Sequence, residues 1–381
     1  MKLEITSFWT ASALGTGNEE TLANLLAGRA PGMREISGDI PGRAIWFGSV
    51  LADLPEIAEP RWNMRTNRLL ALASDALKDE IESLVARYGR DRVGIVLGSS
   101  NTGIDEAEGF IDKWLDDGGS EEAPAVPPPD GFEFTMIELG TTALFLKERL
   151  GVDGPAYTVS TACSSSANAF ASAARLIEKG VCDAVVTGGV DGRCRFAMNG
   201  FAALGALSEG RCRPFAPDRD GINLGEGVGL FLLERPSGAA APREGGARRV
   251  FLEGVGESSD AYHATAPDPS GAGALRAMLG AVEASGMPRE AFDYVNFHGT
   301  GTVANDDMES RALAGFAASA APGCSPRSES TKSLTGHCLG AAGAVEAAIC
   351  ALLIKDGRCS AALSNSFAFG GSNGTVALSG S

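Results

Sequence analysis

The feature that most restricts the fold is a pair of short apolar runs that end in small, turn-forming residues. Val93 to Leu97 (VGIVL) ends in the turn Gly98 to Ser100, and Ala184 to Val186 runs into Thr187 to Gly189. A strand that is apolar on both faces is covered on both faces, as in a sheet packed between helices. These runs therefore predict an α/β protein.

Strand and helix patterns alternate along the rest of the chain. Apolar spacing predicts helices at 65–87, 135–150, 273–285 and 339–354, strands at 251–255, 293–297, 360–365 and 375–378, and a surface loop at 116–131. Such alternation indicates mainly parallel sheets covered by helices. A Pro/Gly/Ala-rich stretch at 236–249 divides the chain into an N-terminal half, 1–236, and a C-terminal half, 250–381. No repeat between the halves is visible in the sequence.

Charge and cysteine content exclude several classes of protein. The net charge of −16 argues against nucleic acid as a partner, because phosphate binding normally needs a basic face. No apolar run is long enough to span a membrane and no signal peptide is evident, so we expect a cytoplasmic protein. The eight cysteines contain no Cys-x-x-Cys pair, which disfavours a metal site or a disulfide framework and predicts mostly buried, reduced thiols.

Cys163 is the first candidate for chemistry. It lies between a β-rich run at 156–159 and a helix predicted over 167–178, in a turn of small residues. A thiol at the N-terminus of a helix feels the helix dipole and nearby backbone N–H groups, which favour the nucleophilic thiolate. The alternative is a small buried packing residue.

Two of the three histidines strengthen the nucleophile interpretation. His298 and His337 each lie in a glycine-flanked loop rather than on a helical apolar stripe, whereas His263 has the setting of an ordinary loop. A cysteine with two histidines supplies a nucleophile together with proton or hydrogen-bond partners. Lys332 and Glu346 flank His337 and suit either a lined pocket or a solvated surface.

One motif is a decoy. Residues 370–374 (GGSNG) satisfy the G-x-S-x-G pattern of a hydrolase nucleophile, but that motif must lead into a helix. A β-rich run follows here, so a glycine-rich turn that offers N–H groups is the better interpretation.

Taken together, six segments resemble the elongating β-ketoacyl-(acyl carrier protein) synthases of the thiolase-like condensing enzyme family. They are 161–165 (TACSS), 213–221 (RPFAPDRDG), 296–302 (NFHGTGT), 332–337 (KSLTGH), 339–343 (LGAAG) and 365–374 (NSFAFGGSNG). They occur in the family's order along the whole chain. The resemblance implies an α/β thiolase fold, with two similar halves in a five-layer αβαβα arrangement, and a dimer.

The resemblance also implies roles for individual residues. Cys163 would accept the acyl group, and His298 and His337 would assist decarboxylation of a malonyl unit. Lys332 and Glu346 would form a supporting charge pair. The remaining roles are an oxyanion hole made by the backbone N–H groups of Cys163 and Phe369, a substrate gate at Phe369, phosphopantetheine contacts from Thr300 and Thr302, and a primer pocket that includes Phe201 and residues near 101–110.

The expected reaction is a decarboxylative Claisen condensation of malonyl carrier with a Cys-bound primer, in fatty acid, polyketide or polyene biosynthesis. It needs no metal or other cofactor, since phosphopantetheine of the acyl carrier protein holds the substrates. The presence of both histidines favours elongation over initiation. Two alternatives remain: a Cys/His acyl-thioester hydrolase, and one subunit of a heterodimeric ketosynthase. We expect the acidic carrier to dock near Arg65 and Arg68, because an acidic protein needs a local basic patch to attract it.

Overall fold

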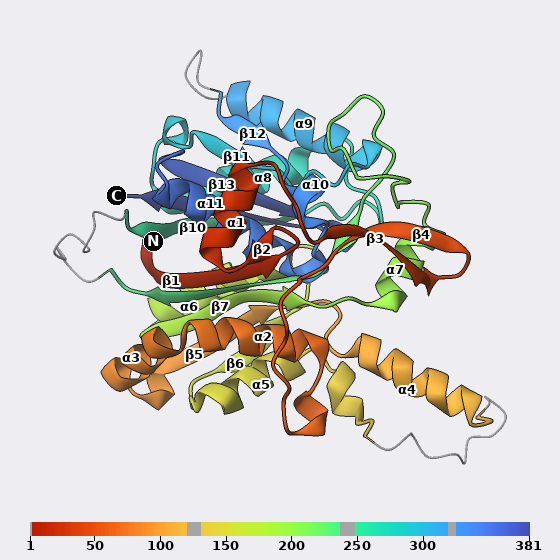
Figure 1. Ribbon diagram of the computed structural model, residues 1–381. Coiled ribbons are helices and arrows are strands. Elements are labelled where there is room, and N and C mark those ends of the chain that lie inside the picture. The colour runs from red at the N-terminus through yellow and green to blue at the C-terminus, as the bar shows by residue number, and fades with distance from the viewer. Residues whose placement is uncertain (1, 120–130, 237–247, 319–324) are drawn as a thin grey trace.

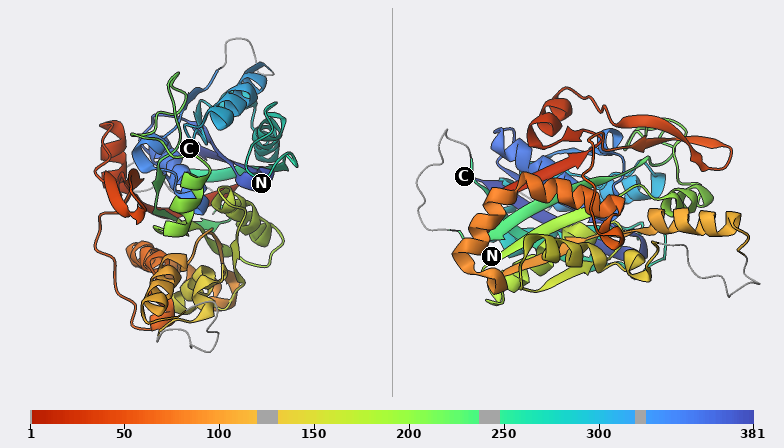
Figure 2. Two further views of the ribbon diagram at one scale, coloured as in Figure 1. Left: turned by 90° about the vertical axis from the view of Figure 1, so that its right-hand side faces the viewer. Right: turned by 60° about the horizontal axis from the view of Figure 1, so that its bottom comes forward.

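The computed structural model describes residues 2–119, 131–236, 248–318 and 325–381 (Figures 1 and 2). One sheet of eleven strands runs through the molecule in the order β12-β11-β13-β14-β10-β1-β9-β7-β5-β6, with β2 beside β1. Its strands are β1 (Leu3–Ser12), β2 (Gly15–Thr16), β5 (Val93–Gly98), β6 (Ala156–Val159), β7 (Ala184–Asp191), β9 (Gly227–Glu234), β10 (Val250–Ser259), β11 (Tyr294–Asn296), β12 (Arg327–Glu329), β13 (Ala361–Phe367) and β14 (Ser372–Gly380).

The sheet contains the same topology twice. The order β6-β5-β7-β9-β1 in the first part of the chain matches β12-β11-β13-β14-β10 in the second. In each set the first three strands are parallel and the last two are antiparallel to their neighbours. The two sets join where β1 pairs with β10, with Glu4 opposite Phe251. The structure therefore reveals a duplication that the sequence does not show.

The expectation of mainly parallel sheets was wrong. In the large sheet, as far as its residues are described, the pairs of β5 with β6 and β7 and of β11 with β12 and β13 are parallel, and all other pairs are antiparallel. The reason is visible between β13 and β14, which a tight turn at Phe369–Gly371 connects as a hairpin. Hairpin connections produce antiparallel neighbours, whereas parallel neighbours need a crossover.

The helices give the arrangement its five layers. They are α1 (Asn18–Leu26), α2 (Arg65–Ala76), α3 (Lys78–Tyr88), α4 (Ile104–Asp116), α5 (Thr141–Leu150), α6 (Ser165–Glu178), α7 (Arg195–Ala203), α8 (Ala272–Ser285), α9 (Val303–Ala318), α10 (Lys332–Thr335) and α11 (Ala342–Lys355). Helices α6 and α11 form the central layer between the two sets of strands. Helices α2 and α5 cover the first set from outside, and α8 and α9 cover the second (Figure 1). The expected five-layer αβαβα fold is confirmed.

The central layer follows from composition. Thirteen of the fourteen residues of α11 (AGAVEAAICALLIK) are buried, and it is apolar on every side apart from Glu346. A helix that is apolar all round has to be surrounded by protein. Small alanines let the flanking strands approach closely, so the loops before α6 and α11 meet in the middle of the molecule.

Several predicted elements have different bounds. The helix expected over 65–87 is divided into α2 and α3 at Leu77, whose backbone leaves helical geometry at φ −111° and ψ 15°. A straight helix of that length would extend about 35 Å, beyond the strands that it covers. The helix expected from 135 begins at Thr141, after a 3₁₀ turn at Phe134–Ile137.

A second, small sheet lies at one end of the molecule, beside α4 and α7 (right in Figure 1). It consists of β3 (Met33–Ile40), β4 (Arg43–Gly48) and β8 (Leu224–Gly225). The expected boundary at 236–249 and most of the expected loop at 116–131 lie outside the described residues. Among the described residues, no helix is both long and apolar enough to cross a membrane. Seven cysteines are described, and all are buried and free.

Candidate active site

Cys163 lies in a turn that its small neighbours hold together. The turn connects β6 to α6, and Ala162 adopts a left-handed conformation at φ 50°. The hydroxyl of Ser165 accepts a hydrogen bond from the N–H of Thr161 and donates one to the carbonyl of Ala162. These contacts stabilise a backbone conformation that a residue other than glycine rarely adopts. The cysteine is thereby fixed at the start of α6, as predicted.

The sequence interpretation favoured a thiolate at Cys163, and the structure contradicts it. Burial raises the pKa of Cys163 to about 12, although the positive charge of Lys332 and the backbone N–H groups of Phe369 and Cys163 lower it. Desolvation disfavours the charged sulfur more than the helix start favours it. The resting cysteine is therefore a thiol. The same N–H groups lie close to the Cys163 sulfur, and their role as an oxyanion hole stays a prediction.

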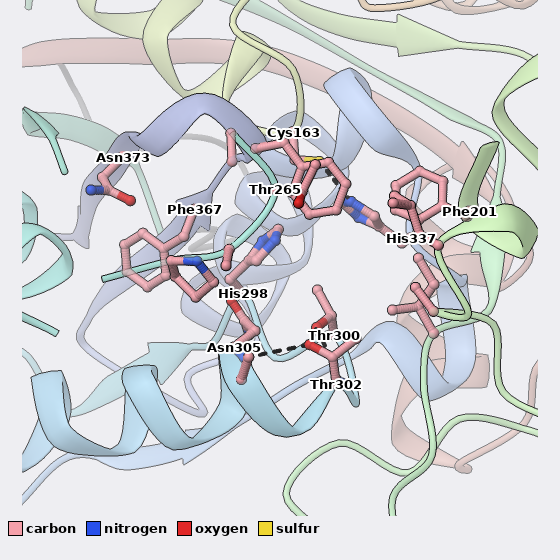
Figure 3. A pocket seen from close by; sticks show the side chains of 18 residues that line it. Cys163, Phe201, Thr265, His298, Thr300, Thr302, Asn305, His337, Phe367 and Asn373 are labelled. Carbon is pink, nitrogen blue, oxygen red and sulfur yellow. Dashed lines mark hydrogen bonds between the residues drawn. The ribbon is translucent and has the colours of Figure 1, made fainter. Parts of the chain in front are cut away.

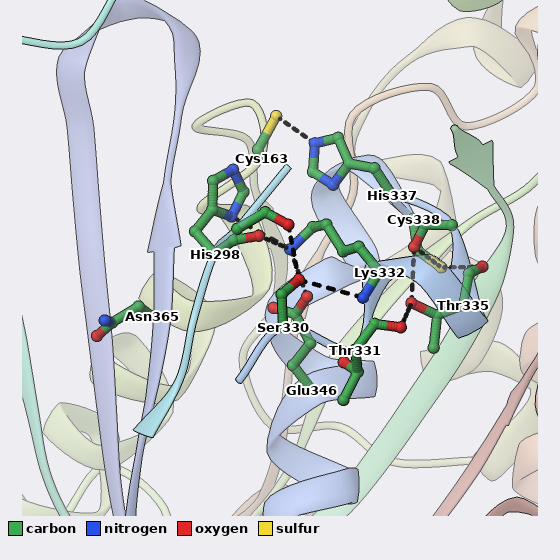
Figure 4. A network of polar contacts seen from close by, with 12 residues as sticks. Cys163, His298, Ser330, Thr331, Lys332, Thr335, His337, Cys338, Glu346 and Asn365 are labelled. Atoms are coloured by element: carbon green, nitrogen blue, oxygen red, sulfur yellow. Dashed lines mark hydrogen bonds and ion pairs between the residues drawn. The ribbon is translucent and has the colours of Figure 1, made fainter. Parts of the chain in front are cut away.

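Both predicted histidines lie beside the thiol (Figure 4). His337 Nε2 is 3.0 Å from Cys163 Sγ, and the rings of His298 and His337 meet edge to face with centroids 5.2 Å apart. Burial, reinforced by the charge of Lys332, lowers the pKa of both histidines well below the usual range. Both imidazoles are therefore neutral near pH 7. The structure brings together the three residues on which the sequence interpretation depended.

Lys332 and Glu346 form a buried ion pair behind the histidines. Their side chains are only 1% and 2% exposed, which excludes the solvated alternative. Lys332 Nζ also donates to the carbonyl of His298 and lies 3.4 Å from His298 Nδ1. Burial raises the pKa of Glu346 to about 7, while Lys332 lowers it. The pair comes together because α10 and α11 pack across the loop that carries His337.

Two buried carboxylates in the site were not predicted. Glu309, on α9, accepts hydrogen bonds from the backbone N–H groups of His298 and Gly299, both at 2.8 Å. Asp191, at the end of β7, accepts them from the residues that follow β5 and from Gly340. Their partners are backbone N–H groups and polar side chains that only the fold brings near, so no residue pattern reports them. The one available signal is an acid at the end of a fully buried strand, at Asp191.

Two cavities meet at Cys163. One, of about 210 Å³, is lined by both histidines and includes Thr300, Thr302 and Asn305 (Figure 3). The other, of about 290 Å³, is apolar and includes Asn101, Ile104 and Leu339. The stacked rings of Phe201 and Phe369, 5.5 Å apart, belong to both cavities. This position fits the gate predicted for Phe369 and the pocket predicted for Phe201.

The two arginines expected to attract a carrier protein are engaged elsewhere. Arg65 forms a two-point contact with Glu226, at 2.6 and 2.5 Å. Arg68 donates to the backbone carbonyls of Leu54 and Pro55. Arg65 is thus paired with an internal carboxylate, whereas Arg68 is bonded to neutral carbonyls and keeps its charge, so docking of a carrier protein near them stays a prediction.

The remaining sequence interpretations of local motifs are confirmed. His263 lies in an exposed loop, where its Nδ1 accepts a hydrogen bond from the N–H of Thr265. The G-x-S-x-G segment leads into strand β14 and not into a helix. Its Gly370 and Gly371 have φ of 82°, as a glycine-rich turn requires.

A buried thiol beside two neutral imidazoles and backbone N–H donors is an arrangement suited to acyl transfer through a cysteine. Comparison with known proteins makes the class specific. The profile of the β-ketoacyl synthase N-terminal domain matches residues 63–239, and that of the C-terminal domain matches 250–365. The chain belongs to the β-ketoacyl synthase family of condensing enzymes, which are acyltransferases.

Curated relatives agree along nearly the whole chain. The 3-oxoacyl-[acyl-carrier-protein] synthase 2 of Rhizobium meliloti is 33% identical, covering 99% of this chain and 98% of its own length. The enzyme of the same name from Staphylococcus aureus is 34% identical over 78% of this chain and 72% of its own.

Solved structures support the fold in detail. A chain of the complex between the ketosynthase ApeO of Xenorhabdus doucetiae and its chain length factor ApeC gives a TM-score of 0.88 at 37% identity, covering 100% of this chain and 98% of that one. The ishigamide ketosynthase/chain length factor gives a TM-score of 0.86 at 27% identity, covering 99% of this chain and 98% of that one. A β-ketoacyl synthase from Burkholderia phymatum gives a TM-score of 0.77 at 26% identity, covering 99% of both chains.

Proposed function

We propose that the protein elongates a Cys163-bound acyl primer by decarboxylative condensation with malonyl-acyl carrier protein. The observation that carries this proposal is the contact of 3.0 Å between His337 Nε2 and Cys163 Sγ, with a neutral His298 lining the same cavity. His337 is placed to take the proton of Cys163, and the second uncharged imidazole, His298, offers a hydrogen-bond donor in the same cavity, which suits an enolate.

In the first half-reaction, Cys163 Sγ attacks the primer thioester. The new C–S bond forms as the sulfur gives up its proton through His337, and the carbonyl oxygen becomes an oxyanion held by the N–H groups of Cys163 and Phe369. The carbon then loses the phosphopantetheine sulfur, which takes the proton. Phe369 admits the primer to the apolar cavity, and Thr300 and Thr302 contact the pantetheine arm.

In the second half-reaction, the malonyl C–C bond breaks and releases CO₂. Its electron pair forms an enolate, whose oxygen accepts hydrogen bonds from His298 and His337. The ammonium of Lys332 can only donate to His298 Nδ1, so the ring proton of His298 is placed on Nε2. The enolate carbon attacks the acyl carbonyl, and Cys163 leaves as thiolate and takes up one proton from solvent. Glu346 holds Lys332 in place.

We propose that the active form contains a second, homologous subunit. The chains with TM-scores of 0.88 and 0.86 come from ketosynthases paired with chain length factors, and this chain retains the complete cysteine and histidine set. It would then be the catalytic member of such a pair, built from halves at 1–236 and 250–381. Buried free thiols suit the reducing cytosol.

The test is mass spectrometry of the protein, alone and with a homologous subunit, after incubation with acyl carrier thioesters and then malonyl carrier. We expect an acyl adduct on Cys163 that disappears as a β-ketoacyl carrier two carbons longer forms. An adduct lost only to water would favour the hydrolase and contradict the proposal.

A further inference from the structure

Asp191 is a fully buried carboxylate at the end of β7 whose bonded partners are all neutral donors. Oδ1 accepts from Ser99 Oγ at 2.8 Å and from the N–H of Asn101 at 3.1 Å. Oδ2 accepts from Ser100 Oγ at 2.7 Å and from the N–H of Gly340 at 2.6 Å. Each oxygen faces a backbone N–H that can only donate, so the ionised carboxylate fits this site.

The groups that Asp191 joins belong to two parts of the site. Ser100 and Asn101 line the apolar cavity of about 290 Å³ at Cys163. Gly340 follows Leu339, which lines the same cavity and has a left-handed backbone at φ 50°. Three residues before Gly340 is His337. One carboxylate therefore connects the wall of the acyl cavity to the loop that carries a histidine.

The close packing at Gly340 shows that this contact has a fixed geometry. A Cβ at that position would lie 2.8 Å from Asp191 Oδ2 and 2.9 Å from the backbone nitrogen of Ser100. No side chain fits at that position, so the backbone of Gly340 contacts the Asp191 carboxylate directly. The backbone of His337 is held by two further hydrogen bonds. Its N–H donates to the carbonyl of Asn223, and its carbonyl accepts from the N–H of Gly225.

We propose that Asp191 is a positioning residue that fixes His337 and the adjoining wall of the acyl cavity as one unit, and so sets primer preference. The inference rests on the proposed condensation. If the Asp191 contact loosens, Gly340 and Leu339 shift together, which changes both the cavity beside Asn101 and the approach of His337 to the reacting carbon.

The test compares wild type with Asp191→Asn. The amide has one acceptor oxygen, so its NH₂ group must face a backbone N–H on one side. We expect condensation to slow roughly tenfold to a hundredfold, and the ratio of rates with a four-carbon and a ten-carbon primer to change roughly tenfold. That ratio does not depend on how much enzyme is folded. Glu253→Gln is the matched control, because Glu253 is a buried carboxylate bonded to Lys2 and Ser379, outside both cavities. An unchanged primer ratio in Asp191→Asn would overturn the proposal.

Hydrogen exchange gives a readout that needs no turnover. The amide of Gly340 should lose protection in Asp191→Asn and keep it in Glu253→Gln. Continued protection in Asp191→Asn would overturn the inference whatever the enzyme does with thioesters. If wild type forms no acyl adduct while the Gly340 amide behaves as expected, the proposed reaction fails and the structural connection stands.

Discussion

The two halves of the molecule share a topology but divide the chemistry. The loops after β5, β6 and β7 correspond in sheet order to those after β11, β12 and β13. The first set supplies Cys163 and the wall of the acyl cavity, and the second supplies His298, His337 and Phe369. One repeated framework thus places different functional groups at equivalent strand ends, which illustrates that function is set by the site and not by the fold.

The halves also differ in how they hold buried charge. In the loop after β5, backbone N–H groups donate to Asp191, whose bonded partners are all neutral. In the loop after β11, backbone N–H groups donate to Glu309, which lies near the charged Lys332–Glu346 pair. The nucleophile half contains a thiol held by a rigid turn. The histidine half contains two imidazoles that burial, reinforced by the charge of Lys332, keeps uncharged. Mutations in the two halves should therefore fail in different ways.

Replacing the nucleophile should have the largest effect. Cys163→Ala should lower condensation by at least about 1000-fold, because no covalent intermediate can form, while the thermal midpoint changes little. Product formation with carrier substrates measures the loss. Cys182→Ala, another buried cysteine of the same half, should remain active. Full product formation by Cys163→Ala would contradict the assignment of Cys163 as the nucleophile.

Removing the lysine should affect stability. Lys332→Met leaves Glu346 buried without its partner and should lower the unfolding free energy by about 3–5 kcal/mol, measured by urea denaturation at pH 8. Glu346→Gln in the same chain should restore much of this. In contrast, Lys78→Met removes the exposed partner of an exposed carboxylate, Glu82, and should cost under about 1 kcal/mol. Equal losses for the two lysines would contradict the importance of the buried pair.

The resting state of the thiol can be tested by alkylation. With a pKa of about 12, the thiolate fraction of Cys163 rises steadily through the accessible range. Iodoacetamide should therefore modify it about tenfold faster for each pH unit between 7 and 9.5, as followed by intact mass. A plateau near pH 7 would instead indicate a stable thiolate–imidazolium pair with His337. Cys163→Ala supplies the background rate.

The smallest expected effect concerns Glu309, whose folded-state pKa is raised by burial to about 7. A carboxyl with a raised pKa contributes stability below its ordinary value near 4.5, and this contribution is lost as pH rises through 7. Between pH 5 and pH 8, Glu309→Gln should remove about 1–3 kcal/mol of this pH dependence. The quantity to compare is the unfolding free energy of the wild type minus that of the variant at each pH. This difference removes the contribution of the histidines, whose lowered pKa values act in the opposite direction, with stability lost as pH falls below 6.5. An identical pH profile for both proteins would refute the shift.

The sequence predicted residue types well and environments poorly. Cys163, His298 and His337 could be found because rare residues lie in glycine-flanked loops within a recognisable order of motifs. The thiolate prediction failed because burial, which the sequence does not report at a single cysteine, outweighed the helix start. Asp191 and Glu309 were missed because their partners are backbone amides and polar side chains from distant parts of the chain. The antiparallel centre of the sheet depends on long-range pairing, which apolar periodicity does not encode.

The position of β1 has a consequence for synthesis. Glu4 pairs with Glu234 on one side and Phe251 on the other, so the first strand of the sequence is central to the finished sheet. At translation rates of about 5–20 residues per second, roughly ten to fifty seconds pass before its partners emerge from the ribosome. During that interval β1 can pair only with the two-residue strand β2, at its end, so most of both its edges stay unpaired, and a nascent chain of more than half the protein needs protection from aggregation.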